Sequence, residues 1–325
     1  MKKRLLSLSL ALLLLAGMSF IHVDAASESP QRPAPKALNA AWFAARPSNA
    51  YSPELALLCA YVAKDTGSFA EEYGVTFDPA YNYEKIIWSD ALDSMGIDFG
   101  LQQFEIGCKQ LGKGAAWIVL KLGTTTSQFG TVLGGYLPGL GRMYQGYYAH
   151  PGYIDYADRV WEALEGFMAE NEALLKGREI KLLVTGHSAG GSCANLLGVR
   201  LRNEGGVGGK AIRPGDTYVY GFESPPVYLG EPGCECGCPY TNIFNLVNTA
   251  DVAALALPGQ RFGRTYAFTC TEPTGQHVHN LGLADYEAGI KAGVAPAGDI
   301  WPRVWTTRDF WQGLMNLLLT GIGLG

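Results

Sequence analysis

The sequence predicts an α/β protein in which helices cover both faces of a mainly parallel β-sheet. Two patterns alternate along the chain: short, fully apolar runs with the length of buried strands, and longer segments with apolar residues at helical spacing. Such alternation is typical of a parallel sheet whose functional groups lie on loops beyond the carboxyl ends of the strands. The predicted strands are residues 117–122, 180–184, 218–222, 243–247 and 266–269, and the predicted helices are residues 51–63, 154–176 and 189–201.

Residues 1–25 have the three parts of a secretory signal peptide. Cations at residues 2–4 precede an apolar run and the small-residue cleavage site Val23-Asp24-Ala25. We therefore expect a secreted protein, extracellular or periplasmic, although the same segment would also serve as an N-terminal membrane anchor. Residues 26–37, rich in proline, serine and alanine, predict a flexible lead-in to a single domain at residues 38–325.

Composition and charge narrow the range of partners. The formal net charge is -5, and removal of the signal peptide takes away three cations and one anion, which leaves a mildly acidic protein. The sequence holds no arginine run or basic patch, so nucleic acid is not an expected partner. With 48% apolar residues the domain can bury a large core. No stable protein partner is predicted.

All seven cysteines lie beyond the signal peptide, and an odd number leaves at least one thiol unpaired if every pair is intramolecular. Cys193, on the third predicted helix, is our choice for a buried free thiol. Three cysteines at residues 234–238 are spaced by single residues, which suits a zinc chelate poorly. A loop held by a disulfide to Cys270 or another cysteine fits better, and we expect no metal and no cofactor.

A glycine-rich corner separates the strand at residues 180–184 from the helix at residues 189–201. Its sequence, Gly186-His187-Ser188-Ala189-Gly190, fits the pattern G-x-S-x-G. In a chain with 42 glycines the pattern alone can arise by chance, but the strand, tight turn and small-residue helical turn that it requires are all predicted here. Such a turn points the hydroxyl of Ser188 out of the backbone at the carboxyl end of a strand. Ser188 is therefore the predicted nucleophile.

A serine hydroxyl needs a neighbouring imidazole to take its proton, and the chain has five histidines. His22 leaves with the signal peptide, and His187 lies beside the nucleophile with its side chain directed away from the hydroxyl. His150 precedes the serine, whereas hydrolases with this turn run in the order serine, acid, histidine. His277 and His279 remain, and their spacing alone does not choose between them.

The acid that orients the imidazole should follow the carboxyl end of a strand between the serine and the histidine. Asp251 comes just after the strand at residues 243–247 and is the best placed carboxylate. Glu223 also follows a strand end and is the second choice. Asp216 precedes its strand, so we expect it at the opposite edge of the sheet.

Four features in this order resemble the class 3 lipase family of α/β-hydrolase triacylglycerol lipases and related esterases: VTGHSAGGSCANLLG, YGFESPPV, NIFNLVNTAD and the late histidine. Upstream, WIVLKLGTTTS is similar to a family strand that ends in Arg-Gly-Thr or Arg-Gly-Ser, and MYQGYY to a Val-His-x-Gly-Phe segment. The resemblance covers roughly residues 50–290. It implies the α/β-hydrolase fold.

The resemblance also implies a role for five residues. Ser188 would be the nucleophile, Asp251 the acid and His279 the base, since His279 is similar to a family histidine that precedes a helix bearing a tyrosine. Thr124 and Ala189 would supply the backbone N–H groups of the oxyanion hole, which stabilises the tetrahedral intermediate.

The sequence departs from the family pattern at several positions. Leu122 and Tyr144 stand where the family usually has arginine and histidine, and Glu223 stands where glycine is common before Ser-Pro. Ala253-Ala254 replace a usual proline after the acid, and Tyr286 lies further from the histidine than the family spacing. None of these changes removes a catalytic atom.

The expected activity is hydrolysis of carboxylic esters through an acyl-enzyme, by a triacylglycerol lipase or lipid esterase whose partner is a lipid or small ester substrate. The apolar, glycine-rich segment at residues 127–140 would carry the family's lid, and it fits a packed helix and loop equally well. The apolar tail at residues 309–325 is too short for a membrane span and fits a helix packed on the core better than a lipid contact. An esterase of acetylated or feruloylated polysaccharide and a non-catalytic lipase-like binding protein are the alternatives.

Overall fold

The computed structural model describes residues 30–64, 68–83, 103–123, 141–228, 239–249, 251, 254, 259–268 and 281–297. Apart from Pro30, these residues fall within one compact unit, Gln31–Gly325. The domain boundaries expected near residues 25 and 37 remain predictions.

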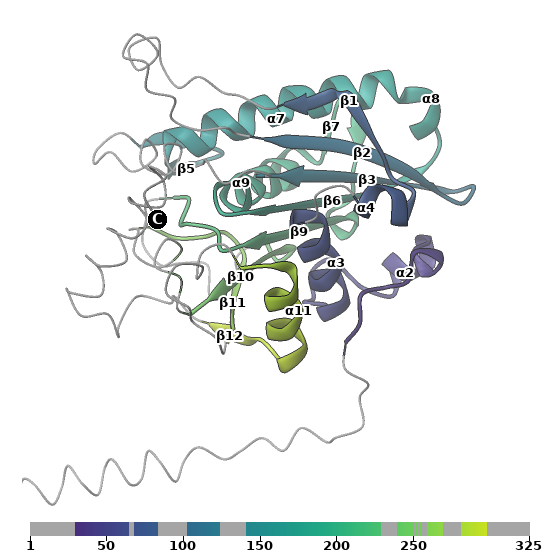
Figure 1. Cartoon of the computed structure of the whole chain (residues 1–325). Coiled ribbons are helices and arrows are strands. Elements are labelled where there is room, and N and C mark those ends of the chain that lie inside the picture. The colour runs from purple at the N-terminus through teal and green to yellow at the C-terminus, as the bar shows by residue number, and fades with distance from the viewer. Residues whose placement is uncertain are drawn as a thin grey trace, which may run out of the picture. The chain divides into compact units, whose positions relative to one another are not determined.

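Within the described residues, an eight-stranded sheet has the order β1-β2-β3-β6-β9-β10-β11-β12 (Figure 1). The run from β3 to β11 is parallel, whereas β1 and β2 at one edge and β12 at the other pair antiparallel. The hairpins β4 with β5 and β7 with β8 form two small separate sheets. The strands are β1 Thr76–Tyr83, β2 Phe104–Leu111, β3 Ala115–Leu122, β4 Arg142–Tyr144, β5 Tyr147–Ala149, β6 Glu179–His187, β7 Gly206–Val207, β8 Lys210–Ala211, β9 Thr217–Phe222, β10 Ile243–Asn248, β11 Arg264–Phe268 and β12 Ala295–Ala297.

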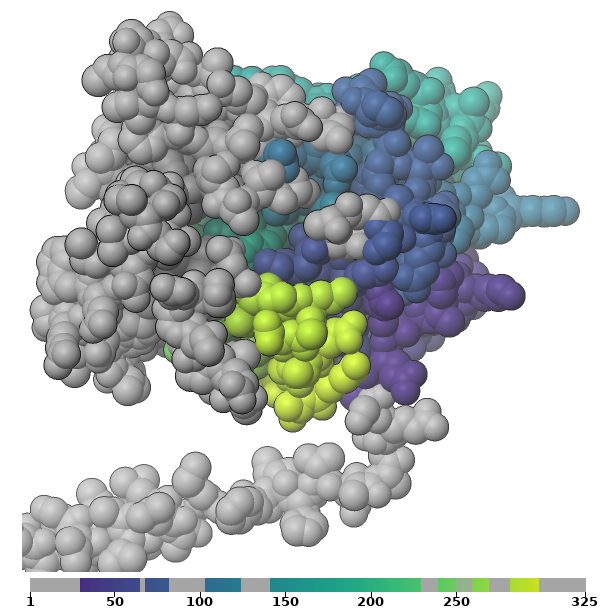
Figure 2. All heavy atoms as spheres, in the orientation of Figure 1, coloured from purple at the N-terminus to yellow at the C-terminus, as the bar shows by residue number. Residues whose placement is uncertain are grey.

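Helices cover both faces of the sheet, which confirms the predicted α/β-hydrolase class (Figure 1). One core holds residues of α7 and α9, and the other holds residues of α2, α3, α4 and α11. On the face shown in Figure 2, α11 lies at the surface beside the N-terminal part of the chain. The helices are η1 Pro35–Ala37, α2 Ala40–Ala44, α3 Pro53–Lys64, α4 Ser68–Tyr73, α7 Pro151–Glu170, α8 Glu172–Leu175, α9 Ala189–Glu204, η2 Pro214–Asp216 and α11 Leu283–Ala292.

Strand β3 illustrates why the sheet needs two layers of helices. Every residue of β3 is buried. Ile118 and Leu120 belong to the core with α7 and α9, whereas Trp117 and Val119 belong to the core with α3 and α11. Because successive side chains of a strand point to opposite faces, a strand that is apolar throughout must be covered on both sides.

The helix predicted at residues 154–176 is observed as two helices, and its start lies earlier. α7 begins at Pro151, whose fixed φ and missing N–H suit the first turn of a helix. At Asn171 the backbone N–H and the side-chain Nδ2 each donate to the carbonyl of Phe167 at 3.0 Å. The backbone of Asn171 then leaves the helical conformation, with φ -94° and ψ 18°, so α7 ends there and α8 follows as a separate turn.

Cys193 is a buried free thiol on α9, as predicted, and Cys59 and Cys108 are free as well. Burial raises the pKa of the Cys193 thiol well above its usual value, which keeps it neutral and unreactive. Among the helices in the described part of the chain, none is both long enough and apolar enough to cross a membrane.

Candidate active site

The chain turns sharply between β6 and α9, and Ser188 stands at the corner. Its backbone has φ 56° and ψ -124°, a conformation that is rare for a residue with a side chain. The backbone N–H of Ser188 donates to the carbonyl of Phe222 at 2.8 Å, so the corner is tied to the end of the neighbouring strand β9. Strained residues of this kind cluster at functional sites.

Three glycines allow the close approach that this turn requires. A Cβ atom on Gly186 would lie 2.5 Å from the carbonyl carbon of Gly190, and one on Gly190 would lie 2.4 Å from the carbonyl oxygen of Leu122. A Cβ atom on Gly191 would lie 2.8 Å from the Cβ of Ser224. Any larger residue would push α9 away from the strand ends, which explains the glycines of the motif.

The end of β3 lies against the same corner and is held there by α7. Gly123, at φ 70°, donates its backbone N–H to the carbonyl of Gln103 at 2.8 Å and to the Tyr156 hydroxyl at 3.0 Å. The Tyr156 hydroxyl in turn donates to the carbonyl of Gln103. The segment that leads into Thr124 is therefore fixed beside the N-terminus of α9, where Ala189 is the first helical residue.

Two carboxyl side chains are fully buried at the carboxyl ends of the parallel strands. Glu223 follows β9 and Asp251 follows β10, and each is 0% exposed. Because β6, β9 and β10 are parallel neighbours, Ser188 lies at the same end of these strands. Glu223 and Asp251 are hydrogen-bonded to each other. Sequence reasoning ranked them as alternatives, and the structure brings them together.

The electrostatics of this pair are dominated by burial. Removal from water disfavours a charged carboxylate, and the neighbouring charge of Asp251 adds to that effect, so the pKa of Glu223 lies well above its usual value. The backbone N–H of Asn248 donates to both carboxyl oxygens of Glu223 at 3.1 Å, which opposes the shift without cancelling it.

A buried network of amides joins the first turns of α9 to β10 and the loop after it. Asn195 donates through Nδ2 to the carbonyl of Gly191 at 2.9 Å and to Asn245 Oδ1 at 2.7 Å. Asn195 Oδ1 accepts the backbone N–H of Phe262 at 3.0 Å. The Ser224 hydroxyl also donates to Asn245 Oδ1, at 2.9 Å. Sequence reasoning missed this network, because amide side chains in apolar segments give no indication of their partners.

The residues next to the corner pack against α11. The Tyr286 ring lies 5.2 Å from the ring of Phe222 and 6.5 Å from the ring of His187, measured between ring centroids. His187 therefore packs toward α11. His150 precedes the first residue of α7 and is buried, and its backbone N–H donates to the carbonyl of Val227 at 3.1 Å.

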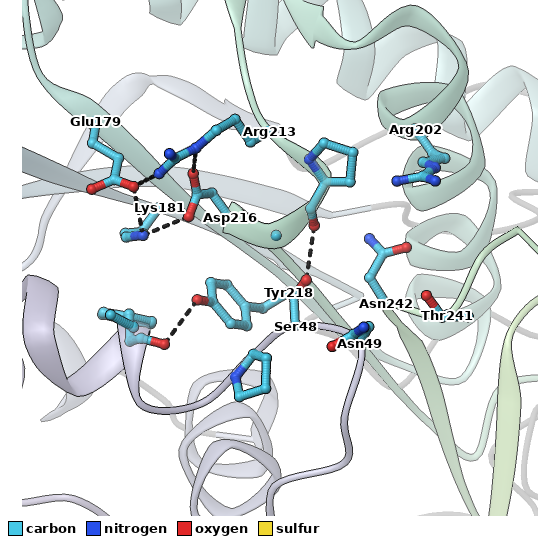
Figure 3. Close-up of a pocket in the computed structure, with 15 residues that line it drawn as sticks. Ser48, Asn49, Glu179, Lys181, Arg202, Arg213, Asp216, Tyr218, Thr241 and Asn242 are labelled. Atoms are coloured by element: carbon cyan, nitrogen blue, oxygen red, sulfur yellow. Dashed lines mark hydrogen bonds and ion pairs between the residues drawn. The ribbon is translucent and has the colours of Figure 1, made fainter.

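A cavity of about 580 Å³ lies at the other end of the parallel strands, where they begin (Figure 3). Ion pairs cross it: Lys181 on β6 pairs with Asp216 and Glu179, and Arg213 pairs with the same two carboxylates. Asp216 precedes β9, so it lies at this end of the strands as predicted. Because these residues stand at the amino ends of the strands, the cavity is separate from Ser188.

Several predicted features lie outside the described residues. They are the signal peptide at residues 1–25, Thr124, the lid at residues 127–140, the cysteines at residues 234–238 and Cys270, both candidate bases His277 and His279, and the tail at residues 309–325.

Part of the chain matches one family model. Residues 119–259 match the model described as Lipase (class 3), while no curated protein matches the sequence. Among solved structures, the triacylglyceride lipase of Rhizomucor miehei is 15% identical, covers 73% of this chain and 94% of its own, and has a TM-score of 0.46. The lipase of Rhizopus microsporus var. chinensis is 14% identical, with coverage of 80% and 95% and a TM-score of 0.45. Lip2 lipase of Yarrowia lipolytica is 14% identical, with coverage of 66% and 76% and a TM-score of 0.41.

All three TM-scores are below 0.5, so the fold assignment rests on the strand order and the strand-turn-helix corner. The matched segment begins in β3 and extends past Asp251, so it includes the corner and both buried carboxyls. Over residues 119–259 this chain has the sequence pattern of the class 3 lipase family, as its motifs predict.

Proposed function

We propose that this protein is a secreted serine hydrolase of carboxylic esters, a triacylglycerol lipase or lipid esterase. The observation that carries the proposal is the strained corner at Ser188, in a segment that matches class 3 lipases, with a buried acid at the end of a nearby parallel strand. Secretion rests on the signal peptide pattern of residues 1–25.

The reaction proceeds in two halves. The Ser188 hydroxyl attacks the ester carbonyl carbon while the histidine takes its proton, and the imidazolium then protonates the alcohol as its bond to the acyl carbon breaks. Water attacks the acyl-enzyme with the same histidine as base, and the acid is released with return of the proton to Ser188. Asp251 orients the imidazole and stabilises its charged form.

The oxyanion hole uses two backbone donors. The N–H of Ala189 directly follows the nucleophile at the start of α9, where backbone N–H groups have no partner within the helix. Thr124 is the second proposed donor, because it follows Gly123 at the end of β3. Each donor acts on the charge that develops in the transition state, and loss of one donor typically costs about 10² to 10³ in kcat.

His279 is the proposed base, with His277 as the alternative. One residue, Asn280, separates His279 from Leu281, which packs in the core beside α11. Tyr286 of that helix contacts the rings of Phe222 and His187 next to the corner. The short sequence distance between His279 and this helix supports the choice of His279 as the base.

Purified variants and a soluble short-chain ester test the triad. Ser188→Ala and His279→Ala should each lower kcat by about 10⁴-fold or more, because little catalysis remains without a triad member. His277→Ala is the matched control and should keep most of the activity. Circular dichroism checks that each variant folds. Turnover by folded Ser188→Ala would refute the proposal, and an inactive His277→Ala beside an active His279→Ala would move the base by two residues.

Chain-length dependence separates lipid esters from polysaccharide esters. A lipase should prefer longer acyl chains, and a lid at residues 127–140 would raise the rate sharply once the ester exceeds its solubility and forms an interface. Replacing Leu133 and Leu137 by serine should weaken that rise. A smooth saturation curve that these replacements leave unchanged would favour an open-cleft esterase.

A further inference from the structure

Glu223 and Asp251 are two buried carboxyl groups at a site where a catalytic triad needs only one acid. Both side chains are 0% exposed, and they are hydrogen-bonded to each other. A hydrogen bond between two carboxyl groups needs a proton on one of them, since two carboxylates in contact only accept. Without water to screen them, both groups cannot carry a charge at neutral pH. The pair therefore holds at least one proton.

The structure holds the Glu223 carboxyl in place from its own backbone and from β10. The backbone N–H of Glu223 donates to the carbonyl of Leu246 at 2.9 Å. The backbone N–H of Asn248 approaches both carboxyl oxygens at 3.1 Å. Asp251 is joined to the same turn, because its backbone N–H donates to the carbonyl of Asn248 at 3.0 Å. The Glu223 carboxyl and the Asp251 backbone are thus both bonded to Asn248.

The backbone of Glu223 is strained. Its φ is 49°, in the left-handed region, which disfavours residues with a Cβ atom and favours glycine. A large ionisable side chain at such a position costs stability both through strain and through burial. Strained backbone conformations of this kind are typical of residues that act in a functional site.

We propose that Glu223 is a positioning residue that donates a hydrogen bond from its protonated carboxyl to Asp251 and keeps the negative charge on Asp251. The inference rests on the proposed function, in which Asp251 is the acid. Glu223 itself touches neither the substrate nor the nucleophile in this role.

Several titratable groups face the pair from other elements. Arg261 and Lys64 favour a charged Glu223, whereas Asp251 disfavours it. Burial lowers the pKa of Lys64 on α3 to about 8, so Lys64 also titrates in the alkaline range. The Tyr286 hydroxyl on α11 stays neutral, because burial and the two carboxyls raise its pKa well above the usual value.

Three variants assign the proton and the charge. Glu223→Leu removes the donor at similar volume and should lower kcat about tenfold with little change in KM, as expected for loss of one hydrogen bond that supports the transition state. Glu223→Gln restores an N–H donor that cannot ionise and should recover most of that loss. Asp251→Asn removes the charge and should lower kcat about 10⁴-fold.

The pH profile separates this role from a packing role. In the wild type, kcat should fall as the pH rises through the raised pKa of Glu223, because Glu223 then loses its proton and repels Asp251. In Glu223→Gln the fall in kcat should be absent or should occur at higher pH. Any fall in kcat that remains belongs to Lys64 or another titratable group. A residue that only fills space would give parallel profiles in the two proteins.

Infrared spectroscopy gives a readout that needs no turnover. The carbonyl stretch of a protonated carboxylic acid should be present in the resting wild type at neutral pH and lost in Glu223→Gln. Absence of the band, or its survival in that variant, would overturn the inference, as would a Glu223→Gln protein as inactive as Asp251→Asn. If the wild type hydrolyses no ester and Ser188 does not react with a fluorophosphonate, the proposed function fails, and the catalytic role of Glu223 fails with it.

Discussion

At the scale of single residues, the candidate site concentrates features that cost stability. Ser188 and Glu223 both have positive φ without being glycine, and they directly follow the neighbouring parallel strands β6 and β9. Glu223 and Asp251 add two fully buried carboxyls. Backbone strain and buried carboxyl groups at adjacent strand ends both lower stability. Such features are typical of functional sites, where the rest of the fold provides the stability.

Glu223 should make the folded state less stable as pH rises. Its pKa in the folded protein lies well above its ordinary value of 4.5, so between these two values the folded state binds more protons than the unfolded state. Stability therefore falls with increasing pH, by up to about 1.4 kcal/mol per pH unit for one group. Glu223→Gln removes this group, so its unfolding free energy relative to the wild type should increase steadily with pH.

Urea unfolding of both proteins at several pH values between about 5 and 7 measures that difference. The range ends at about pH 7 because Lys64, with its pKa lowered to about 8, begins to lose its proton above it. Lys64 has the opposite sign there, since its unfolded state binds more protons. A constant difference between the two proteins across the range would contradict a protonated Glu223.

At the scale of elements, strand ends and helix starts determine which residues meet. α9 begins at Ala189 directly after the strained corner and ends where Gly205, at φ 71°, donates its backbone N–H to the carbonyl of Leu201 at 3.0 Å. The Asn195 network then fixes α9 against β10 and Phe262. The position of Ser188 therefore depends on buried polar groups as well as on glycine.

Replacing Asn195 by leucine should destabilise the protein by about 2 to 5 kcal/mol, because it leaves several buried polar groups without partners. The backbone N–H of Phe262 would lose its acceptor, and Asn245 would lose a donor. Asn203→Leu, at an exposed position of the same helix, is the control: it loses one exposed hydrogen bond to Gln145 and a long one from Tyr240, and should destabilise the protein much less. Chemical denaturation of both variants makes the comparison, and equal effects would show that the network contributes little.

The parallel part of the fold could be predicted from the sequence because its strands are apolar on both faces. β3, β6, β9 and β10 are buried along almost their whole length, so each stands out as an apolar run. Strand β2, which lies between the edge strand β1 and β3, was missed, because it mixes buried with partly exposed residues and includes Lys109 and Gln110. The break at Asn171 was also missed, since it depends on the backbone conformation of one residue and leaves the helical periodicity intact.

The candidate site could be predicted only in part for a similar reason. Ser188 and Asp251 were found from their places after strands, which is information along the chain. The contact between Glu223 and Asp251 depends on β9 and β10 being neighbours, which the sequence pattern alone does not specify. The two carboxylates therefore appeared as competing candidates.

At the scale of the whole molecule, the two ends of the parallel strands have different roles. Ser188, Glu223 and Asp251 lie at the carboxyl ends of the strands, whereas Lys181 and Asp216 form a buried ion pair at the amino ends (Figure 3). The pair links β6 to the start of β9 across the sheet. A sheet that is stabilised at the amino ends of its strands can tolerate the loss of stability caused by strained and charged groups at the carboxyl ends.

Asp216→Asn should separate stability from activity. Lys181 would keep only the more exposed Glu179 as a partner, and breaking a buried pair by removing one member typically costs about 3 to 5 kcal/mol. Arg213→Gln is the matched control, because the Arg213 side chain is 70% exposed and its ion pairs should contribute less than about 1 kcal/mol. At temperatures where both variants remain folded, kcat and KM for a short-chain ester should equal those of the wild type. A lower kcat in folded Asp216→Asn would instead mean that the two ends are coupled through β6 and β9, and that the strain at Ser188 depends on the ion pair at the far end of its own strand.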